Sequence, residues 1–329
     1  INPSLSPSVS SSLRLSLPQS PHPSVSPSPR PPVSSTPLLV NHEIVNLPSA
    51  STLAVLRRET AKRPPAPKTI ALLADPIFEK SDERLKLAGA QTQPATQSSN
   101  QTGNQTGNQT GETDRQRPQN LARAIEAFAE SKDEFAFPRL TSTGWEAEQI
   151  AKLAPTDQVF KATSFDANRQ LATSGKLSDY RIVHFASHSF INATRPDLSG
   201  IVLSLVDRRG QEQDGFLRLH EIYDLRLPAD LVVLGGCRTG LGKEIKGEGL
   251  MSLTRGFMYS GASRVIVSAW EVQDRPSATL MVKFYRGMLG PKRLSAAAAL
   301  RAAQIEMLRD KQFAAPYFWA GFTLQGEWK

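Results

Sequence analysis

A short aliphatic run within residues 230–242 constrains the fold of this chain more than any other stretch. Residues 231–234 read Leu-Val-Val-Leu without polar alternation, and two glycines, Gly235 and Gly236, then lead to Cys237, the only cysteine. Such a run is typical of a strand covered on both faces in a parallel sheet, and ligands of open α/β sheets bind where these strands end. The sequence therefore predicts an α/β fold with Cys237 on a turn at the end of a core strand, where chemistry is usually done.

Strands and helices alternate along residues 38–329, which is the signature of an α/β protein. The strands predicted from aliphatic runs are residues 38–48 at an edge, 68–74, 158–162, 181–186, 201–205, 264–269 and an aromatic-rich final strand at 317–324. The helices predicted from capping residues and apolar spacing are 49–58, 121–130, 146–153, 164–173 and 295–309, with one more after Cys237 and one near Asp274.

Two segments lack the apolar residues that a packed core requires. Residues 1–37 are mostly Ser and Pro and predict a disordered linker, because they bury too little surface to offset the entropy of ordering. Residues 91–118 repeat Asn-Gln-Thr-Gly three times and predict a disordered insertion. The chain begins with Ile1 rather than Met, from which we expect a further domain upstream. The sequence thus predicts one folded domain, residues 38–329.

Composition narrows the classes of function. The chain holds 39 Lys and Arg against 31 Asp and Glu, but the basic residues are scattered among acids, so we expect no nucleic-acid partner. No run approaches the roughly 18 apolar residues of a membrane span, and no signal peptide is recognisable. A single cysteine forms no internal disulfide, which predicts a cytoplasmic protein. The histidines have no clustered ligands, so we expect neither a metal nor a cofactor.

A histidine and a cysteine follow two of the predicted core strands. His188 comes after residues 181–186, and Cys237 comes after the aliphatic run. A thiol beside an imidazole is the minimum apparatus for covalent acyl transfer, since the imidazole raises the thiolate fraction of a group whose usual pKa is about 8.5. Glycines before the thiol let backbone N–H groups point at an oxyanion, each worth about 3 kcal/mol. The alternative is that Cys237 is a small buried hydrophobe.

A series of motifs in fixed order resembles a known family. The motifs are residues 183–188 (Val-His-Phe-Ala-Ser-His), 214–217, 235–242 (Gly-Gly-Cys-Arg-Thr-Gly-Leu-Gly), 247–250, 267–274, 284–285 and 317–322. Together they resemble the CHAT domain, a bacterial caspase-like cysteine peptidase family often found downstream of TPR repeats. The resemblance covers roughly residues 38–329.

The resemblance implies a three-layer αβα caspase-like fold with a mostly parallel central sheet. It implies His188 as general acid or base and Cys237 as the nucleophile that forms a thioester with a protein or peptide substrate. It also implies an oxyanion hole built from the backbone of Ser189, Gly236 and Cys237, with Ser189 standing where the family often has glycine. An upstream TPR domain or a regulatory protein is the implied partner.

In caspase-like folds the loop after the next strand lines the substrate cleft. That loop here contains Trp270, Glu271 and Asp274, whose two carboxylates would attract a basic residue before the scissile bond. The alternative is that Asp274 caps its own helix and Glu271 is solvated. We favour the alternative, because capping by itself explains an aspartate at this position.

Other classes of enzyme fit less well. A cysteine-dependent phosphatase needs arginine six residues after the cysteine, where this chain has Lys243, and no dinucleotide fingerprint or Gly-x-Ser-x-Gly elbow occurs. Two functions stay open. One is a cysteine endopeptidase, and the other is a catalytically weak CHAT scaffold that binds a peptide or protein partner. The presence of both His188 and Cys237 favours the peptidase.

Overall fold

The computed structural model describes residues 36–91, 137–191, 199–239 and 248–328. The chain divides into two units, Ile1–Pro37 and Leu38–Lys329, and every element below belongs to the second. Apart from residues 36 and 37 and Gln91, which ends a helix, the two segments predicted to be disordered lie outside the described residues. The predicted helix at 121–130 also lies outside them.

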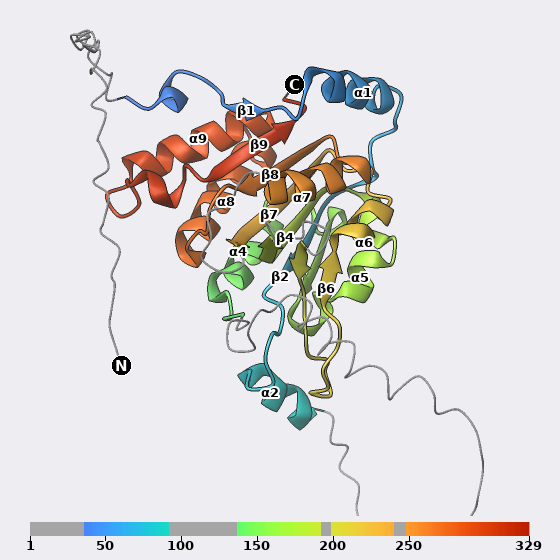
Figure 1. Cartoon of the computed structure of the whole chain (residues 1–329). Coiled ribbons are helices and arrows are strands. Elements are labelled where there is room, and N and C mark those ends of the chain that lie inside the picture. Colours follow the sequence, from blue (N-terminus) through green and yellow to red (C-terminus); the bar gives the residue numbers. More distant parts are fainter. Residues whose placement is uncertain (1–35, 92–136, 192–198, 240–247, 329) are drawn as a thin grey trace, which may run out of the picture. The chain divides into compact units, whose positions relative to one another are not determined.

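A central sheet of nine strands among the described residues has the order β1-β9-β8-β7-β4-β2-β3, with β5 and β6 attached at β4 (Figure 1). Neighbouring strands pair in parallel except for β8 with β9, β4 with β5 and β5 with β6, so the mostly parallel sheet predicted from the sequence is confirmed. The strands are β1 (Val45–Asn46), β2 (Lys68–Ala74), β3 (Val159–Thr163), β4 (Tyr180–Ile191), β5 (Gly200–Val202), β6 (Phe216–Arg218), β7 (Leu231–Thr239), β8 (Arg264–Ser268) and β9 (Phe322–Gly326).

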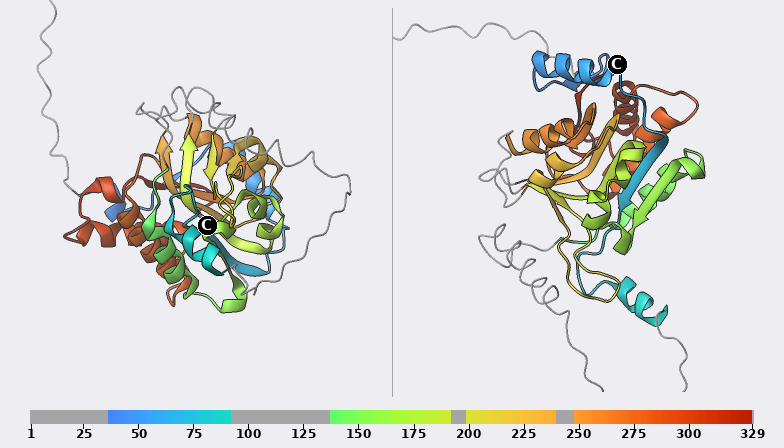
Figure 2. Two further views of the ribbon diagram at one scale, coloured as in Figure 1. Left: turned by 90° about the horizontal axis from the view of Figure 1, so that it is seen from below. Right: turned by 90° about the vertical axis from the view of Figure 1, so that its right-hand side faces the viewer.

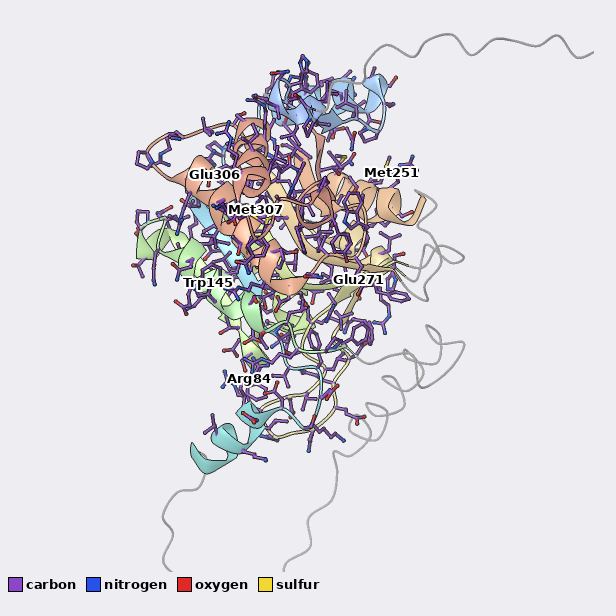
Figure 3. The ribbon with its side chains drawn as sticks, turned by 90° about the vertical axis from the view of Figure 1, so that its left-hand side faces the viewer. Arg84, Trp145, Met251, Glu271, Glu306 and Met307 are labelled. Atoms are coloured by element: carbon purple, nitrogen blue, oxygen red, sulfur yellow. The ribbon has the colours of Figure 1, made fainter. Side chains whose placement is uncertain are left out.

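Helices cover both faces of this sheet and make it the middle of three layers (Figure 2). Helices α4, α8 and α9 pack on one face, seen in Figure 3 with Trp145 on α4 and Met307 on α9. Helices α5, α6 and α7 pack on the other face. The helices are α1 (Ala50–Thr60), α2 (Glu83–Gln91), α4 (Thr141–Ala151), α5 (Arg169–Thr173), α6 (Leu219–Asp224), α7 (Glu248–Tyr259), α8 (Asp274–Leu289) and α9 (Ala296–Arg309).

The aliphatic run of β7 explains why both faces are covered. Successive side chains of a strand point to opposite faces, so Leu231 and Val233 join the core beneath α4, α8 and α9. Val232 and Leu234 join the core beneath α6 and α7. All four are fully buried, and each buried aliphatic side chain stabilises the fold by about 1.5–3 kcal/mol. A polar substitution at any of these four positions would therefore disrupt the packing of one of the two cores.

The prediction that the histidine strand ends at residue 186, before His188, is wrong. Strand β4 continues to Ile191, because its last residues find backbone partners on two sides. Ser189 pairs with Ile201 of β5, and His188 pairs with Gly236 of β7. Pairing across the chain thus overrides the weak strand propensity of the Ser and Gly residues at this edge.

Local signals placed other elements correctly or nearly so. Strand β2 has the predicted bounds, and Ser49 caps α1 by accepting a hydrogen bond of 3.0 Å from the Thr52 amide. The predicted edge strand at 38–48 is mostly wrong, since Leu38–Val40 is a 3₁₀ turn whose carbonyls accept hydrogen bonds from Arg301. The predicted helix at 164–173 is shortened to α5, and the predicted strand at 317–324 is shifted to β9, which begins at Phe322 and ends at Gly326. A 3₁₀ turn precedes each element.

Candidate active site

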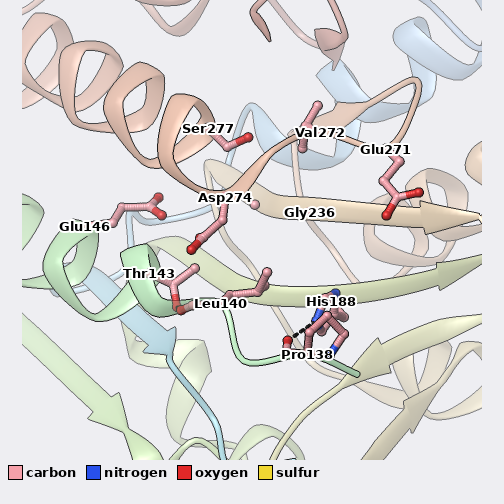
Figure 4. Close-up of a pocket in the computed structure, with 11 residues that line it drawn as sticks. Pro138, Leu140, Thr143, Glu146, His188, Gly236, Glu271, Val272, Asp274 and Ser277 are labelled. Atoms are coloured by element: carbon pink, nitrogen blue, oxygen red, sulfur yellow. Dashed lines mark hydrogen bonds between the residues drawn. The ribbon is translucent and has the colours of Figure 1, made fainter. Parts of the chain in front are cut away.

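His188 lies near the carboxyl end of β4 with its ring held in a fixed orientation. Its Nε2 lies 2.8 Å from the carbonyl oxygen of Pro138 (Figure 4). The centroid of the ring lies 5.2 Å from that of the Phe78 ring and 5.6 Å from that of the Phe137 ring. A carbonyl only accepts hydrogen bonds, so Nε2 carries the proton and donates. In the neutral ring Nδ1 is then the nitrogen that can take up a proton, as a general base must.

The Pro138 carbonyl is itself fixed by an ion-pair cluster at the end of β2. Asp75 accepts two hydrogen bonds from Arg139, of 2.9 and 2.8 Å, and Arg84 lies 2.8 Å from the same carboxylate. The hydrogen bonds to Asp75 raise the pKa of the Arg139 guanidinium above its usual value. Because Arg139 follows Pro138 directly, Asp75 anchors the residue that orients His188.

A bulge between β4 and β7 brings the backbone of His188 opposite Gly236, the residue before Cys237. The register passes from Phe185 opposite Leu234 to His188 opposite Gly236, so two residues of β4 oppose Gly235 alone. A Cβ at Gly235 would lie 3.2 Å from the Ala186 Cα, tighter than ordinary contacts. Glycine is therefore what allows the strands to approach here.

Cys237 belongs to β7, which continues to Thr239, so the predicted turn at the cysteine is wrong. Its backbone pairs with Ser189, one step beyond the pair of His188 with Gly236. The side chain of Cys237 and the residues 240–247 lie outside the described part of the chain. The structure thus brings the backbones of the four predicted site residues together as two neighbouring pairs, His188 with Gly236 and Ser189 with Cys237.

Ser189 fits its backbone without strain. The non-glycine residues with positive φ in the described chain are Asp75, Ser164 and Arg293, so the site does not require glycine at 189. The Ser189 side chain is fully buried, and its Oγ forms no hydrogen bond with any residue that the structure describes. A buried hydroxyl in this state costs stability.

We expect Ser189→Ala to leave the free energy of unfolding unchanged or to raise it by up to about 1 kcal/mol, because it removes an unpaired buried hydroxyl. Ser187→Ala is the matched control, since the Ser187 Oγ donates to the Val202 carbonyl and its loss should cost about 1 kcal/mol. Urea denaturation measures both. Equal destabilisation by the two substitutions would contradict the prediction.

A pocket of about 110 Å³ opens beside His188 (Figure 4). It brings together His188, Gly236, Glu271 and Asp274, all predicted from the sequence. Trp270 does not line it, because its indole N–H donates to the Tyr317 carbonyl at 3.0 Å. The described lining residues are Pro138, Leu140, Thr143, Glu146, His188, Gly235, Gly236, Glu271, Val272, Asp274 and Ser277.

Asp274 caps a different helix from the one predicted. Its own helix α8 has Gln273 at the N-cap and no side-chain cap, whereas the Asp274 Oδ2 accepts a 2.8 Å hydrogen bond from the Ser142 amide. Ser142 lies in the first turn of α4, where the helix dipole favours a negative charge. Packing of α4 against α8 brings this second N-terminus within reach. Glu271 is exposed, as the favoured alternative expects, and also lines the pocket.

Sequence reasoning missed Glu146, a buried carboxyl of α4 on the pocket wall. It is 2% exposed, and its Oε1 lies 3.3 Å from the His184 Nε2 without forming a hydrogen bond. Burial, reinforced by the charge of Asp274, raises the pKa of Glu146 to about 8, and burial lowers the pKa of His184 to about 3. Both groups are therefore mainly neutral at pH 7. The available signal was a glutamate on the same helix face as Ile150.

The mostly parallel sheet, covered by helices on both faces and with a pocket beside the end of β4, defines a three-layer α/β protein. The family model described as "CHAT domain" matches residues 22–327, and the chain belongs to this family. None of the helices in the described residues is long and apolar enough to cross a membrane.

Relatives in other proteins cover only part of this chain. It is 38% identical over 114 residues to human tetratricopeptide repeat protein 28 and 38% identical over 106 residues to the mouse protein. These matches span 35% and 32% of this chain but 4% of each relative. A solved Saccharomyces cerevisiae separase–securin complex is similar at a TM-score of 0.43 and 13% identity, over 86% of this chain and 14% of that one.

Proposed function

We propose that residues 38–329 form the domain of a cysteine endopeptidase in which His188 and Cys237 are the catalytic pair. The observation that carries the proposal is the pairing of β4 with β7, which puts His188 opposite Gly236 and one rung from Cys237, beside a pocket. Membership of the CHAT family supports the same assignment. The substrate class is a protein or peptide.

In the proposed reaction, the Cys237 thiol gives its proton to Nδ1 of His188 and the thiolate attacks the scissile carbonyl carbon. The tetrahedral intermediate collapses when His188 returns the proton to the leaving amine, which breaks the C–N bond and leaves a thioester. Water then attacks the thioester with His188 as base, and the thiol is regenerated. The hydrogen bond from Nε2 to Pro138 stabilises the imidazolium formed in both halves.

The proposed oxyanion hole is built from the backbone of Ser189, Gly236 and Cys237. One preorganised N–H donor contributes about 3 kcal/mol to the transition state of acyl transfer. The positions are supported by the adjacency of the rungs that hold these residues. Serine at 189 keeps the backbone amide that glycine would supply.

A catalytically weak scaffold that binds a peptide through the same pocket is the rival function, motivated by Ser189. The test treats the wild-type protein with an electrophilic peptide probe and with a peptide library. We expect covalent labelling of Cys237 and cleavage of some library members. If neither labelling nor cleavage occurs in the presence of the partner that activates the full-length protein, the peptidase proposal is wrong and the binding scaffold is the remaining function.

We further propose that helical TPR repeats upstream gate the pocket, and that the enzyme works in the cytoplasm. The names of the two mammalian relatives support an association with such repeats. Bacterial origin stays a prediction from the family resemblance. The gating proposal predicts that the labelling rate of Cys237 changes when the repeat domain is present.

A further inference from the structure

Two buried carboxyl oxygens of residues that line the pocket beside His188 form no hydrogen bond within the described part of the chain. One is Glu146 Oε1, which lies 3.3 Å from the His184 Nε2, and the other is Asp274 Oδ1, although Asp274 Oδ2 accepts a hydrogen bond at the start of α4. In Figure 4 the Glu146 carboxyl group points toward Asp274, whose own carboxyl group points toward the start of α4. Leaving a buried acceptor unpaired costs stability. A ligand that donates hydrogen bonds at this place would remove that cost.

The ionisable groups that line the pocket are mostly acids. Its described lining includes three carboxyl groups, with Glu146 and Asp274 inside and the exposed Glu271 from the loop before α8, and no Lys or Arg. His184 does not supply a positive charge, since burial lowers its pKa to about 3. The described part of the pocket therefore offers acceptors and negative charge without a balancing cation.

We propose that this pocket binds the guanidinium group of a substrate arginine, with Glu146 and Asp274 as its hydrogen-bond acceptors and Glu271 near the entrance. Guanidinium presents five N–H donors in a planar fork, which suits two carboxyl groups better than a single ammonium does. The inference deepens the proposed function and rests on it, because only a peptidase or peptide-binding role brings a peptide side chain to the pocket. It names the residue before the scissile bond as arginine.

Binding of this cation is coupled to release of a proton. Burial raises the pKa of Glu146 to about 8, so this carboxyl is mostly protonated at pH 7 before a ligand binds. The titratable groups packed around it are His184 from β4, together with Asp274 and Tyr285 from α8. A bound guanidinium favours the carboxylate and expels the proton to solvent.

The sign of the pH dependence follows from this coupling. Because the ligand-bound pKa of Glu146 lies below the free value, affinity for arginine rises with pH and levels off above about pH 8. A neutral side chain gains nothing from ionisation of Glu146. The pH profile thus separates recognition of a cation from ordinary filling of an apolar cavity.

The test is calorimetric titration of Cys237→Ala protein, which cannot cleave, with acetyl-Ala-Ala-Arg-amide and with the matched peptide that carries citrulline. Citrulline keeps the shape of arginine without its charge. At pH 8 we expect the arginine peptide to bind at least tenfold more tightly than the citrulline peptide. In buffers of different ionisation enthalpy at pH 7, we expect release of close to one proton with arginine and none with citrulline.

Two substitutions on α4 make the assignment specific. Glu146→Gln should abolish proton release and flatten the pH profile for the arginine peptide. Glu148→Gln is the matched control on the same helix, because Glu148 is exposed and pairs with Lys161 of β3; it should change neither. Asp274→Asn should weaken arginine binding and reduce proton release without abolishing it, because burial is the larger cause of the raised pKa of Glu146 and the charge of Asp274 the smaller.

Equal affinity for the arginine and citrulline peptides, or undiminished proton release in Glu146→Gln, would overturn the inference. Its failure is distinguishable from failure of the proposed function. Cleavage by the wild-type protein after neutral residues alone would keep the peptidase and remove the arginine site. Arginine-selective binding without labelling or cleavage would keep the site and remove the peptidase.

Discussion

Cys237→Ala is expected to abolish labelling by the electrophilic peptide probe and to lower kcat/KM for peptide cleavage by at least about 10³-fold, because no other group supplies the nucleophile. His188→Asn is expected to lower kcat by about 10²–10⁴-fold, the usual contribution of a positioned acid or base. Peptide affinity should change little in His188→Asn, since the loss falls on the chemical step. Steady-state kinetics with a cleaved library peptide measures both variants.

His220→Asn is the control for these two substitutions. His220 is an exposed histidine of α6 and does not line the pocket, so its replacement should leave kcat and KM unchanged. Cleavage that persists at the wild-type rate in Cys237→Ala would contradict the assignment of the nucleophile. Equal losses in His188→Asn and His220→Asn would contradict the assignment of the acid–base residue.

Asp75→Asn is expected to lower the free energy of unfolding by about 2–3 kcal/mol, since it leaves Arg84 and Arg139 without their shared carboxylate. The estimate is below the range for a fully buried pair because the Arg139 side chain is 43% exposed. The same substitution loosens the Pro138 carbonyl that orients His188, so kcat should fall more than KM rises. Urea denaturation and steady-state kinetics give the two readouts.

The matched control for Asp75 is Asp166→Asn. Asp166 also pairs with an arginine, Arg208, but both side chains are more than half exposed. Such a surface pair is worth about 0–1 kcal/mol and lies in no contact with the pocket. A loss as large for Asp166→Asn as for Asp75→Asn would show that the cluster at the end of β2 has no special role.

The parts of the fold that follow from local sequence were predictable. Strand β2 and helix α1 have the expected positions because an aliphatic run and a serine cap act within a few residues. The extension of β4 was not predictable, since Ser189 remains in a strand only through partners in β5 and β7 that are distant in sequence. A residue with weak intrinsic preference takes the structure of its neighbours.

The candidate site divides in the same way. His188 and Cys237 follow recognisable runs, and their strands prove to be neighbours. The Pro138 carbonyl left no signal, because any backbone offers a carbonyl and the contact with His188 spans 50 residues. Asp274 was correctly read as a capping residue but assigned to the wrong helix, since only packing decides which N-terminus it meets.

The cluster on Asp75 also has an evolutionary consequence. Arg84 precedes residues 92–136 and Arg139 follows them, yet both side chains meet on one carboxylate. The chain between these anchors includes the three Asn-Gln-Thr-Gly units. If the connection behaves as a flexible chain, as its composition predicts, doubling its length costs only about 0.6 kcal/mol. Lineages could therefore gain or lose whole units without moving the carbonyl that orients His188.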